Sequence, residues 1–250
     1  MDDLDARFFR GFSRKVKVIF GRAVVDTDRM THPFPFAAVL FDLDGVIINT
    51  TPLHYRVWEV FARRRGYIPT QAELLATNGV RAAETMRLWF GAGLSDAEID
   101  ALTAEQAAYI NEVLEAESVD AIPGVHDYVA SLVAAKISRA IATSARPENA
   151  ARYLQKLGLT GQFDTLITSA DVSEGKPHPA VYLKAASVLR VDPKKCVVIE
   201  DSVSGIQAAK AAGAKCISLT TTFTQDVLSA QKPDWLFKDF TEIPAELRPR

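Results

Sequence analysis

The chain has few cysteines, no long apolar segment and almost no net charge, and each absence argues against a class of protein. Only two of its 250 residues are cysteines, Cys196 and Cys216, which argues against a disulfide scaffold and predicts two buried thiols. The formal net charge of −2 offers no broad basic surface for nucleic acid. No apolar run approaches the roughly 20 residues that a membrane-spanning helix needs. We expect a cytoplasmic monomer or small homo-oligomer that binds neither nucleic acid nor membrane.

Short apolar runs alternate with helical patterns from residue 124 onward, which is typical of a doubly wound α/β sheet. The first run, 37–41, ends at Asp42 as a buried parallel strand would. The other strand-like runs are 137–142, 166–167, 196–199, 216–219 and 235–237, and helical periodicity fills 124–135, 147–158, 179–190 and 203–213. We predict the α/β fold class, with a mainly parallel sheet.

The segment between the first two predicted strands is too long for one crossover and shows several helical patterns. It includes a predicted helix over 95–117, which begins with the capping-box spacing of Ser95 and Glu98. We interpret residues 54–122 as an inserted helical cap on a core formed by 36–53 and 123–250. Residues 1–35 are predicted to be an N-terminal extension.

Polar side chains follow three of the predicted strands, at the point where each strand ends. Because ligands of a doubly wound sheet bind outside the carboxyl ends of its strands, we expect these side chains to share one crevice. Each residue alone also fits a structural role, such as a turn, a helix cap or a solvated loop, and only their joint placement favours a site. The candidates are Asp42 and Asp44, Thr143 and Ser144, Glu200 and Asp201, and Lys176 from the turn before the helix at 179.

Four carboxylates in one crevice need a positive partner, because each close pair costs about 1 to 4 kcal/mol. Oxygen ligands with room for water suit Mg²⁺, whereas the four histidines are scattered and form no spacing for a softer metal. We therefore predict a Mg²⁺ cofactor.

An aspartate can act as a nucleophile and form an aspartyl-phosphate, and this is the role predicted for Asp42. Asp44, two residues on, is placed to protonate the leaving oxygen and then to deprotonate the attacking water. Gly45 lets the chain turn close to the phosphoryl group. The charge on the phosphoryl oxygens would be met by Mg²⁺, Lys176, the Thr143 hydroxyl and backbone N–H groups.

Four motifs carry a resemblance to a known superfamily. They are Phe41-Asp42-Leu43-Asp44-Gly45-Val46, Thr143-Ser144, Lys176-Pro177 and Val198-Ile199-Glu200-Asp201-Ser202-Val203-Ser204-Gly205-Ile206. With them the chain resembles the haloacid dehalogenase-like superfamily over about residues 37–240, in the branch with a helical cap and a Rossmann-like core.

The resemblance implies the same roles for Asp42 and Asp44, with Thr143 as a phosphate ligand and Lys176 as the charge balance. It implies that Mg²⁺ is held by the Asp42 carboxylate, the Asp44 carbonyl and Asp201, and by Glu200 directly or through water. An acid at position 44 points to phosphoryl transfer rather than dehalogenation, because a halide leaving group needs no proton.

Residues 50–54 with Trp58, and the cap turn 78–81, look similar to β-phosphoglucomutases and related sugar-phosphate phosphatases. The mutases have an arginine one residue later in that turn and a cap lysine near Glu105, so the acid here favours a phosphatase. The candidate substrate-binding residues are His54, Arg81, Ser144 and Arg146.

The function predicted from the sequence is a Mg²⁺-dependent phosphatase of a small phosphorylated metabolite such as a sugar phosphate. Three alternatives stay open: an intramolecular phosphosugar mutase, a signalling receiver that is phosphorylated on aspartate, and a non-catalytic binding module.

Overall fold

A six-stranded parallel sheet forms the centre of the computed structural model, which describes residues 19–20, 23–24, 34–77, 80–91, 93–116 and 119–249. The strand order is β5-β4-β3-β6-β7-β8, and every pairing is parallel. The strands are β3 (Ala38–Phe41), β4 (Ser138–Ala142), β5 (Thr165–Ile167), β6 (Cys196–Glu200), β7 (Lys215–Leu219) and β8 (Trp235–Phe237). The predicted α/β fold class is confirmed.

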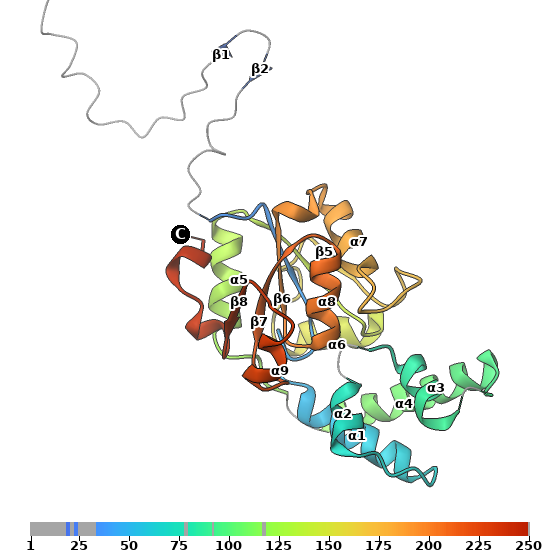
Figure 1. Cartoon of the computed structure of the whole chain (residues 1–250). Helices are drawn as coiled ribbons and strands as arrows, with labels where there is room; N and C mark the ends of the chain where they lie inside the picture. Colours follow the sequence, from blue (N-terminus) through green and yellow to red (C-terminus); the bar gives the residue numbers. More distant parts are fainter. Residues whose placement is uncertain are drawn as a thin grey trace, which may run out of the picture.

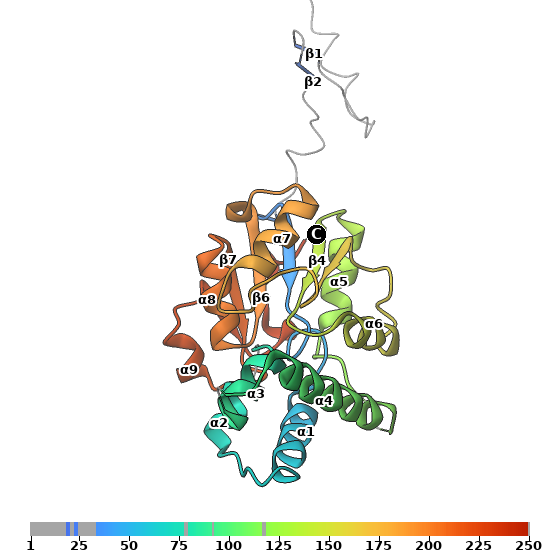
Figure 2. The ribbon, with the colours of Figure 1, turned by 90° about the vertical axis from the view of Figure 1, so that its right-hand side faces the viewer.

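Helices cover both faces of this sheet, as the alternation of side chains along a strand requires. On β3, Val39 and Phe41 pack in the apolar cluster that includes α5 and α6, whereas Ala38 and Leu40 pack in the cluster that includes α7 and α8. Figure 2 shows these two layers. The core helices are α5 (Val125–Ala134), α6 (Pro147–Lys156), α7 (Ala180–Leu189), α8 (Val203–Ala211) and the short α9 (Gln225–Ser229).

Smaller elements complete the description of the core. Single 3₁₀ turns precede β6 and follow β8, at Pro193–Lys195, Phe240–Glu242 and Ala245–Leu247. Both cysteines are free and buried, as predicted. The predicted N-terminal extension lies mostly outside the described residues; the described parts of it are β1 (Ile19–Phe20) and β2 (Ala23–Val24), which pair antiparallel, and residues 34–35.

Among the described residues, four helices inserted after β3 form the cap, which lies beyond the carboxyl ends of the strands (Figure 1). Their apolar faces meet in a separate cluster that includes Trp58, Phe61 and Trp89. The capping box of Ser95 and Glu98 is present, with hydrogen bonds in both directions. The cap helices are α1 (Thr51–Arg63), α2 (Gln71–Ala76), α3 (Ala82–Phe90) and α4 (Asp96–Ala116).

Helix α1 begins at Thr51, three residues before the predicted start of the cap at residue 54. A β-bridge between Ile48 and Ala121 joins the two segments that connect the cap to the core. The exact division into domains stays a prediction. In the described part of the chain, no helix is both long and apolar enough to cross a membrane.

Candidate active site

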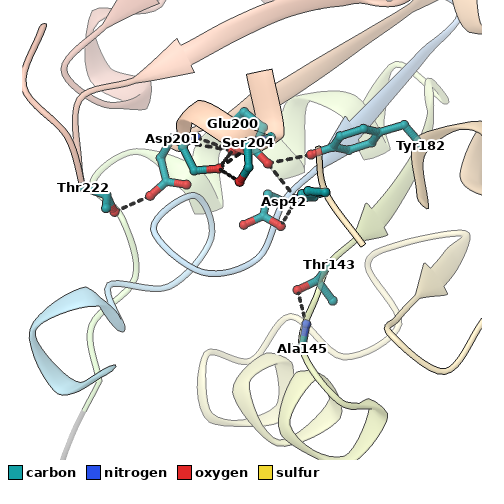
Figure 3. A network of polar contacts seen from close by, with 11 residues as sticks. Asp42, Thr143, Ala145, Tyr182, Glu200, Asp201, Ser204 and Thr222 are labelled. Atoms are coloured by element: carbon teal, nitrogen blue, oxygen red, sulfur yellow. Dashed lines mark hydrogen bonds and ion pairs between the residues drawn. The ribbon is translucent and has the colours of Figure 1, made fainter. Parts of the chain in front are cut away.

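The strand register brings the predicted site residues to one edge of the sheet. Phe41 pairs with Ile141 of β4 on one side and with Ile199 of β6 on the other. The residues that follow these strands are therefore neighbours, and Figure 3 shows the Asp42 carboxylate between the Glu200–Asp201 segment and Thr143. The structure thus brings together the polar residues of three strand ends.

Gly45 makes the sharp turn after Asp42 possible. Its φ of +74° lies in the left-handed region, and an added Cβ atom would stand 1.8 Å from Oδ2 of Asp201. The chain can pass this close to the Asp201 carboxylate only because residue 45 has no side chain.

Lys176 is the buried cation of the site. Its ammonium donates hydrogen bonds to Oδ1 of Asp42 and to Oε1 of Glu200, both at 2.6 Å, and only 1% of the residue is exposed. Burial by itself would lower the pKa of this ammonium, but the two carboxylates outweigh burial and raise it. Lys176 is therefore charged, and it offsets part of the negative charge of the two carboxylates.

Both oxygens of Glu200 already accept hydrogen bonds. Oε1 accepts from Lys176 and from the Tyr182 hydroxyl at 2.7 Å, while Oε2 accepts from the N–H groups of Asp201 and Ser202 at 2.8 and 2.9 Å. Burial would raise the pKa of Glu200, but Lys176 and these hydrogen bonds lower it. This carboxylate is ionised, and it fixes the position of Lys176.

Three buried carboxylates could hold a metal ion. Asp42, Glu200 and Asp201 each offer one oxygen, and the three oxygens lie within 4.8 Å of one another. Burial raises the pKa of Asp42 to about 7, with Glu200 and Asp44 adding to the rise and Lys176 opposing it. Burial, with Glu200 and Asp42 adding to the effect, raises the pKa of Asp201 well above its usual value. A divalent cation would relieve this uncompensated charge, and oxygen donors suit Mg²⁺.

Asp44 points its carboxylate toward the solvent-accessible side of the site. The Thr50 hydroxyl donates to Oδ1 of Asp44 at 2.6 Å, and Nε2 of His54 lies 3.6 Å from the same oxygen. About a quarter of the Asp44 side chain is exposed, against 8% for Asp42. Asp44 is thus oriented by its neighbours and remains accessible, as an acid/base group must be.

Thr143 lies on the opposite side of Asp42 from the metal group. Its hydroxyl oxygen accepts a hydrogen bond from the N–H of Ala145 at 3.0 Å (Figure 3), which leaves the hydroxyl proton free to donate to a ligand.

A cavity of about 430 Å³ opens above these residues, between the core and the cap. This volume is in the range of small-molecule sites. Lys176 and Glu200 are not among its lining residues and lie behind Asp42. The predicted site residues that line the cavity are Asp42, Asp44, His54, Arg81, Thr143, Ser144, Arg146 and Asp201.

Residues 39–219 match the family described as haloacid dehalogenase-like hydrolase. The chain belongs to this family. It is 35% identical over 210 residues to validoxylamine A 7'-phosphate phosphatase of Streptomyces hygroscopicus subsp. limoneus, covering 83% of this chain and 96% of that protein. It is 35% identical over 180 residues to hexitol phosphatase A of Escherichia coli, covering 72% and 81%. The prediction of a phosphoric monoester hydrolase of this superfamily is confirmed.

A solved structure supports the same assignment. The crystal structure of a HAD hydrolase of family IA, variant 3, from Entamoeba histolytica matches with a TM-score of 0.77 and 31% identity, covering 84% of this chain and 96% of that one. The hydrolase therefore has the fold of its family.

The guanidinium of Arg81 donates hydrogen bonds to the core of the hydrolase. Nη1 donates to the carbonyl of Ser173 at 2.9 Å, and Nη2 donates to the carbonyls of Val172 and Ser169 at 2.5 and 3.1 Å. Gly175 makes room for the arginine stem, because a Cβ there would lie 2.9 Å from its Cγ. Arg81 thus joins the cap to the loop before Lys176, in addition to lining the cavity.

Glu105, which sequence comparison with the mutases singled out, does not line the cavity. It is exposed and forms an ion pair with Arg65 on the outside of the cap. Its neighbour Gln106 faces the cavity instead. The acid at position 105 therefore does not by itself separate a phosphatase from a mutase.

Several cavity residues were missed by sequence reasoning. On α4 they are spaced as residues of one helix face are, at i, i+3, i+4 and i+7, a signal that is readable once the helix is known to face the site. The missed residues include Thr103, Gln106, Ala107 and Ile110 on α4, and Asn149 and Tyr153 on α6.

Proposed function

We propose that this hydrolase removes the phosphoryl group from a small phosphorylated metabolite, such as a sugar phosphate, through an aspartyl-phosphate on Asp42. The observation that carries the proposal is the setting of Asp42. Its Oδ1 is held by the buried Lys176, beside two further buried carboxylates and at the floor of a ligand-sized cavity. The related phosphatases of validoxylamine A 7'-phosphate and hexitol phosphates support a substrate of this kind.

The first step is attack on phosphorus. Lys176 fixes Oδ1 of Asp42, so the second oxygen, Oδ2, is left to form the new bond. Asp44 donates a proton to the oxygen of the departing alcohol. The Thr143 hydroxyl donates a hydrogen bond to a phosphoryl oxygen, and the positive charge of Lys176 stabilises the negative charge that develops in the transition state.

The second step is hydrolysis of the acyl phosphate. Asp44, now ionised, takes a proton from a water molecule that attacks phosphorus, and the bond to Asp42 breaks. Mg²⁺, held by Asp42 and Asp201 with Glu200 beside them, would offset the charge on the phosphoryl oxygens in both steps.

Hydrolysis of p-nitrophenyl phosphate with Mg²⁺ tests this mechanism. The Asp42→Asn variant should lose activity by about 10⁴-fold or more, because the amide is a poor nucleophile. Asp226→Asn, on the exposed side of α9, is the matched control and should keep its rate. If Asp42→Asn hydrolysed the ester at the wild-type rate, the proposed nucleophile would be wrong.

Product analysis separates the alternatives. With a phosphosugar substrate and a bisphosphate primer, the phosphatase releases inorganic phosphate, whereas a mutase would isomerise the sugar. Stable phosphorylation of Asp42 from a donor without turnover would favour the receiver. Lack of hydrolysis across a panel of phosphorylated metabolites would favour a binding module.

A further inference from the structure

One face of α4 forms a wall of the cavity without any charged group. Thr103, Gln106, Ala107 and Ile110 all line the cavity, and their spacing puts them on the same side of the helix. The small Ala107 leaves space beside Gln106, so a ligand can approach the polar groups of this wall.

Two polar side chains of this wall have no hydrogen-bond partner among the described residues. The Thr103 hydroxyl is buried without a hydrogen bond to any described residue. Gln106 is only 3% exposed, and in the described part of the chain its amide forms no hydrogen bond. On the core side of the cavity, the Tyr153 hydroxyl is likewise buried and unpartnered. Buried polar groups are normally satisfied, so groups left open in a cavity point to a ligand that satisfies them.

The basic side chains that line the cavity already contact protein groups. His54 lies against Asp44, Arg81 donates to three backbone carbonyls, and Arg146 lies 3.8 Å from Glu148. The described lining residues on α4 include no lysine or arginine, and the two lining arginines stand at the starts of other helices, Arg81 before α3 and Arg146 before α6. The wall therefore suits hydroxyl groups, which both donate to and accept from an amide or a threonine.

We propose that Thr103 and Gln106 determine specificity by binding hydroxyl groups of the leaving alcohol, so that the enzyme prefers monophosphate esters of uncharged, polyhydroxylated alcohols. This inference rests on the proposed function, because it assigns the part of the substrate that Asp44 protonates on departure. Gln106 binds one hydroxyl through its amide, and Thr103, one helical turn earlier, binds the next.

A substrate series tests the proposal without any mutation. The wild-type enzyme is assayed with a hexitol monophosphate, with hexyl phosphate as its hydroxyl-free analogue of equal length, with a hexitol bisphosphate and with p-nitrophenyl phosphate. We expect kcat/KM for the hexitol monophosphate to exceed that for hexyl phosphate by about 100-fold or more, because a site built for hydroxyls is left unpaired by the analogue. The value of kcat/KM for the hexitol bisphosphate should be lower than that for the hexitol monophosphate, because the α4 wall has no charged group to bind a second phosphate.

Two near-isosteric variants then assign the preference to its residues. Gln106→Leu and Thr103→Val should each lower kcat/KM for the hexitol monophosphate by about 5- to 100-fold, with a far smaller loss for hexyl phosphate. Gln155→Leu, at an exposed position of α6, is the control for the change of side chain. Their melting temperatures show whether the variants are folded.

The outcomes are distinct. Equal kcat/KM values for hexitol monophosphate and hexyl phosphate in the wild type would overturn this proposal. Hydrolysis of p-nitrophenyl phosphate in the same experiment would still support the proposed function. Equal losses on both alkyl esters in the two variants would also overturn it, because a structural role of the side chains predicts that pattern. Absence of hydrolysis of every ester by the wild type would overturn the proposed function and this inference together.

Discussion

Replacing Lys176 with methionine should destabilise the hydrolase far more than removing an exposed lysine. Methionine fills much of the space of the lysine stem but has no ammonium group. The change leaves Asp42, Glu200 and Asp201 buried together without their cation, since the two 2.6 Å hydrogen bonds from Nζ are lost. The Lys176 side chain is fully buried, so water cannot screen the remaining charges.

The size of the effect follows from this burial. Removing one partner of a buried ion pair costs about 3 to 5 kcal/mol of unfolding free energy. In a domain of this size each kcal/mol lowers the melting temperature by about 2 to 4 °C, so we expect a drop of about 6 to 20 °C. Added Mg²⁺ should restore part of the loss, because a divalent cation replaces the missing positive charge.

The matched control is Lys215→Met. Lys215 also forms a 2.7 Å ion pair, with Asp234, but 57% of its side chain is exposed. Such a pair contributes at most about 1 kcal/mol, or less than about 4 °C. Thermal unfolding followed by circular dichroism, in chelator at pH 7, measures both variants. If Lys176→Met melted within 2 °C of the wild type, or no lower than Lys215→Met, the reasoning from buried charge would be refuted.

Three further predictions concern the same site. Thr50→Val removes the hydrogen bond to Asp44 and should lower kcat about tenfold for alkyl phosphates but little for p-nitrophenyl phosphate, whose leaving group needs no proton; equal losses on both would contradict this. Gly45→Ala places a Cβ atom 1.8 Å from Asp201 Oδ2 and should lower kcat/KM by about 100-fold or more in steady-state assays, an expectation that near-normal kinetics would refute. Mg²⁺ should raise the melting temperature more at pH 8 than at pH 5.5. The pKa of Asp42 is raised to about 7 in the folded, metal-free protein, so at pH 5.5 the metal must displace a proton from this carboxylate, whereas in the unfolded chain the carboxylate is already ionised. Equal shifts at the two pH values would contradict this.

The core part of the site could be predicted from sequence because strand ends are readable. A continuous apolar run that stops at an acid marks both the strand and its carboxyl end, as it does for β3 and Asp42. Parallel strands in register then bring Thr143 and Glu200 to the same edge of the sheet, and this placement does not depend on the conformation of the loops. The contact between Tyr182 and Glu200 could not be predicted, because Tyr182 lies within a mostly apolar helix whose sequence pattern does not show that its hydroxyl reaches the site.

The cap could be predicted as a helical insert but not as a binding surface. A helix turns by about 100° per residue, so a shift of one position exchanges an outward residue for an inward one. This is the difference between Glu105, paired with Arg65 outside, and Gln106, which lines the cavity. The contacts of Arg81 were beyond sequence reasoning for another reason, because they go to backbone carbonyls of a loop about 90 residues away.

The junction between core and cap shows how the two parts depend on each other. Helix α1 begins at Thr51, whose hydroxyl contacts that of Thr222 at 2.8 Å, and Thr222 in turn donates to Asp201. One residue earlier, Thr50 donates to Asp44. The carboxyl groups of Asp44 and Asp201 are therefore both oriented by contacts that begin at the start of α1. A movement of α1 that opened the cavity would also disturb the acid/base and a metal ligand, so that substrate enclosure and alignment of the reacting groups occur together.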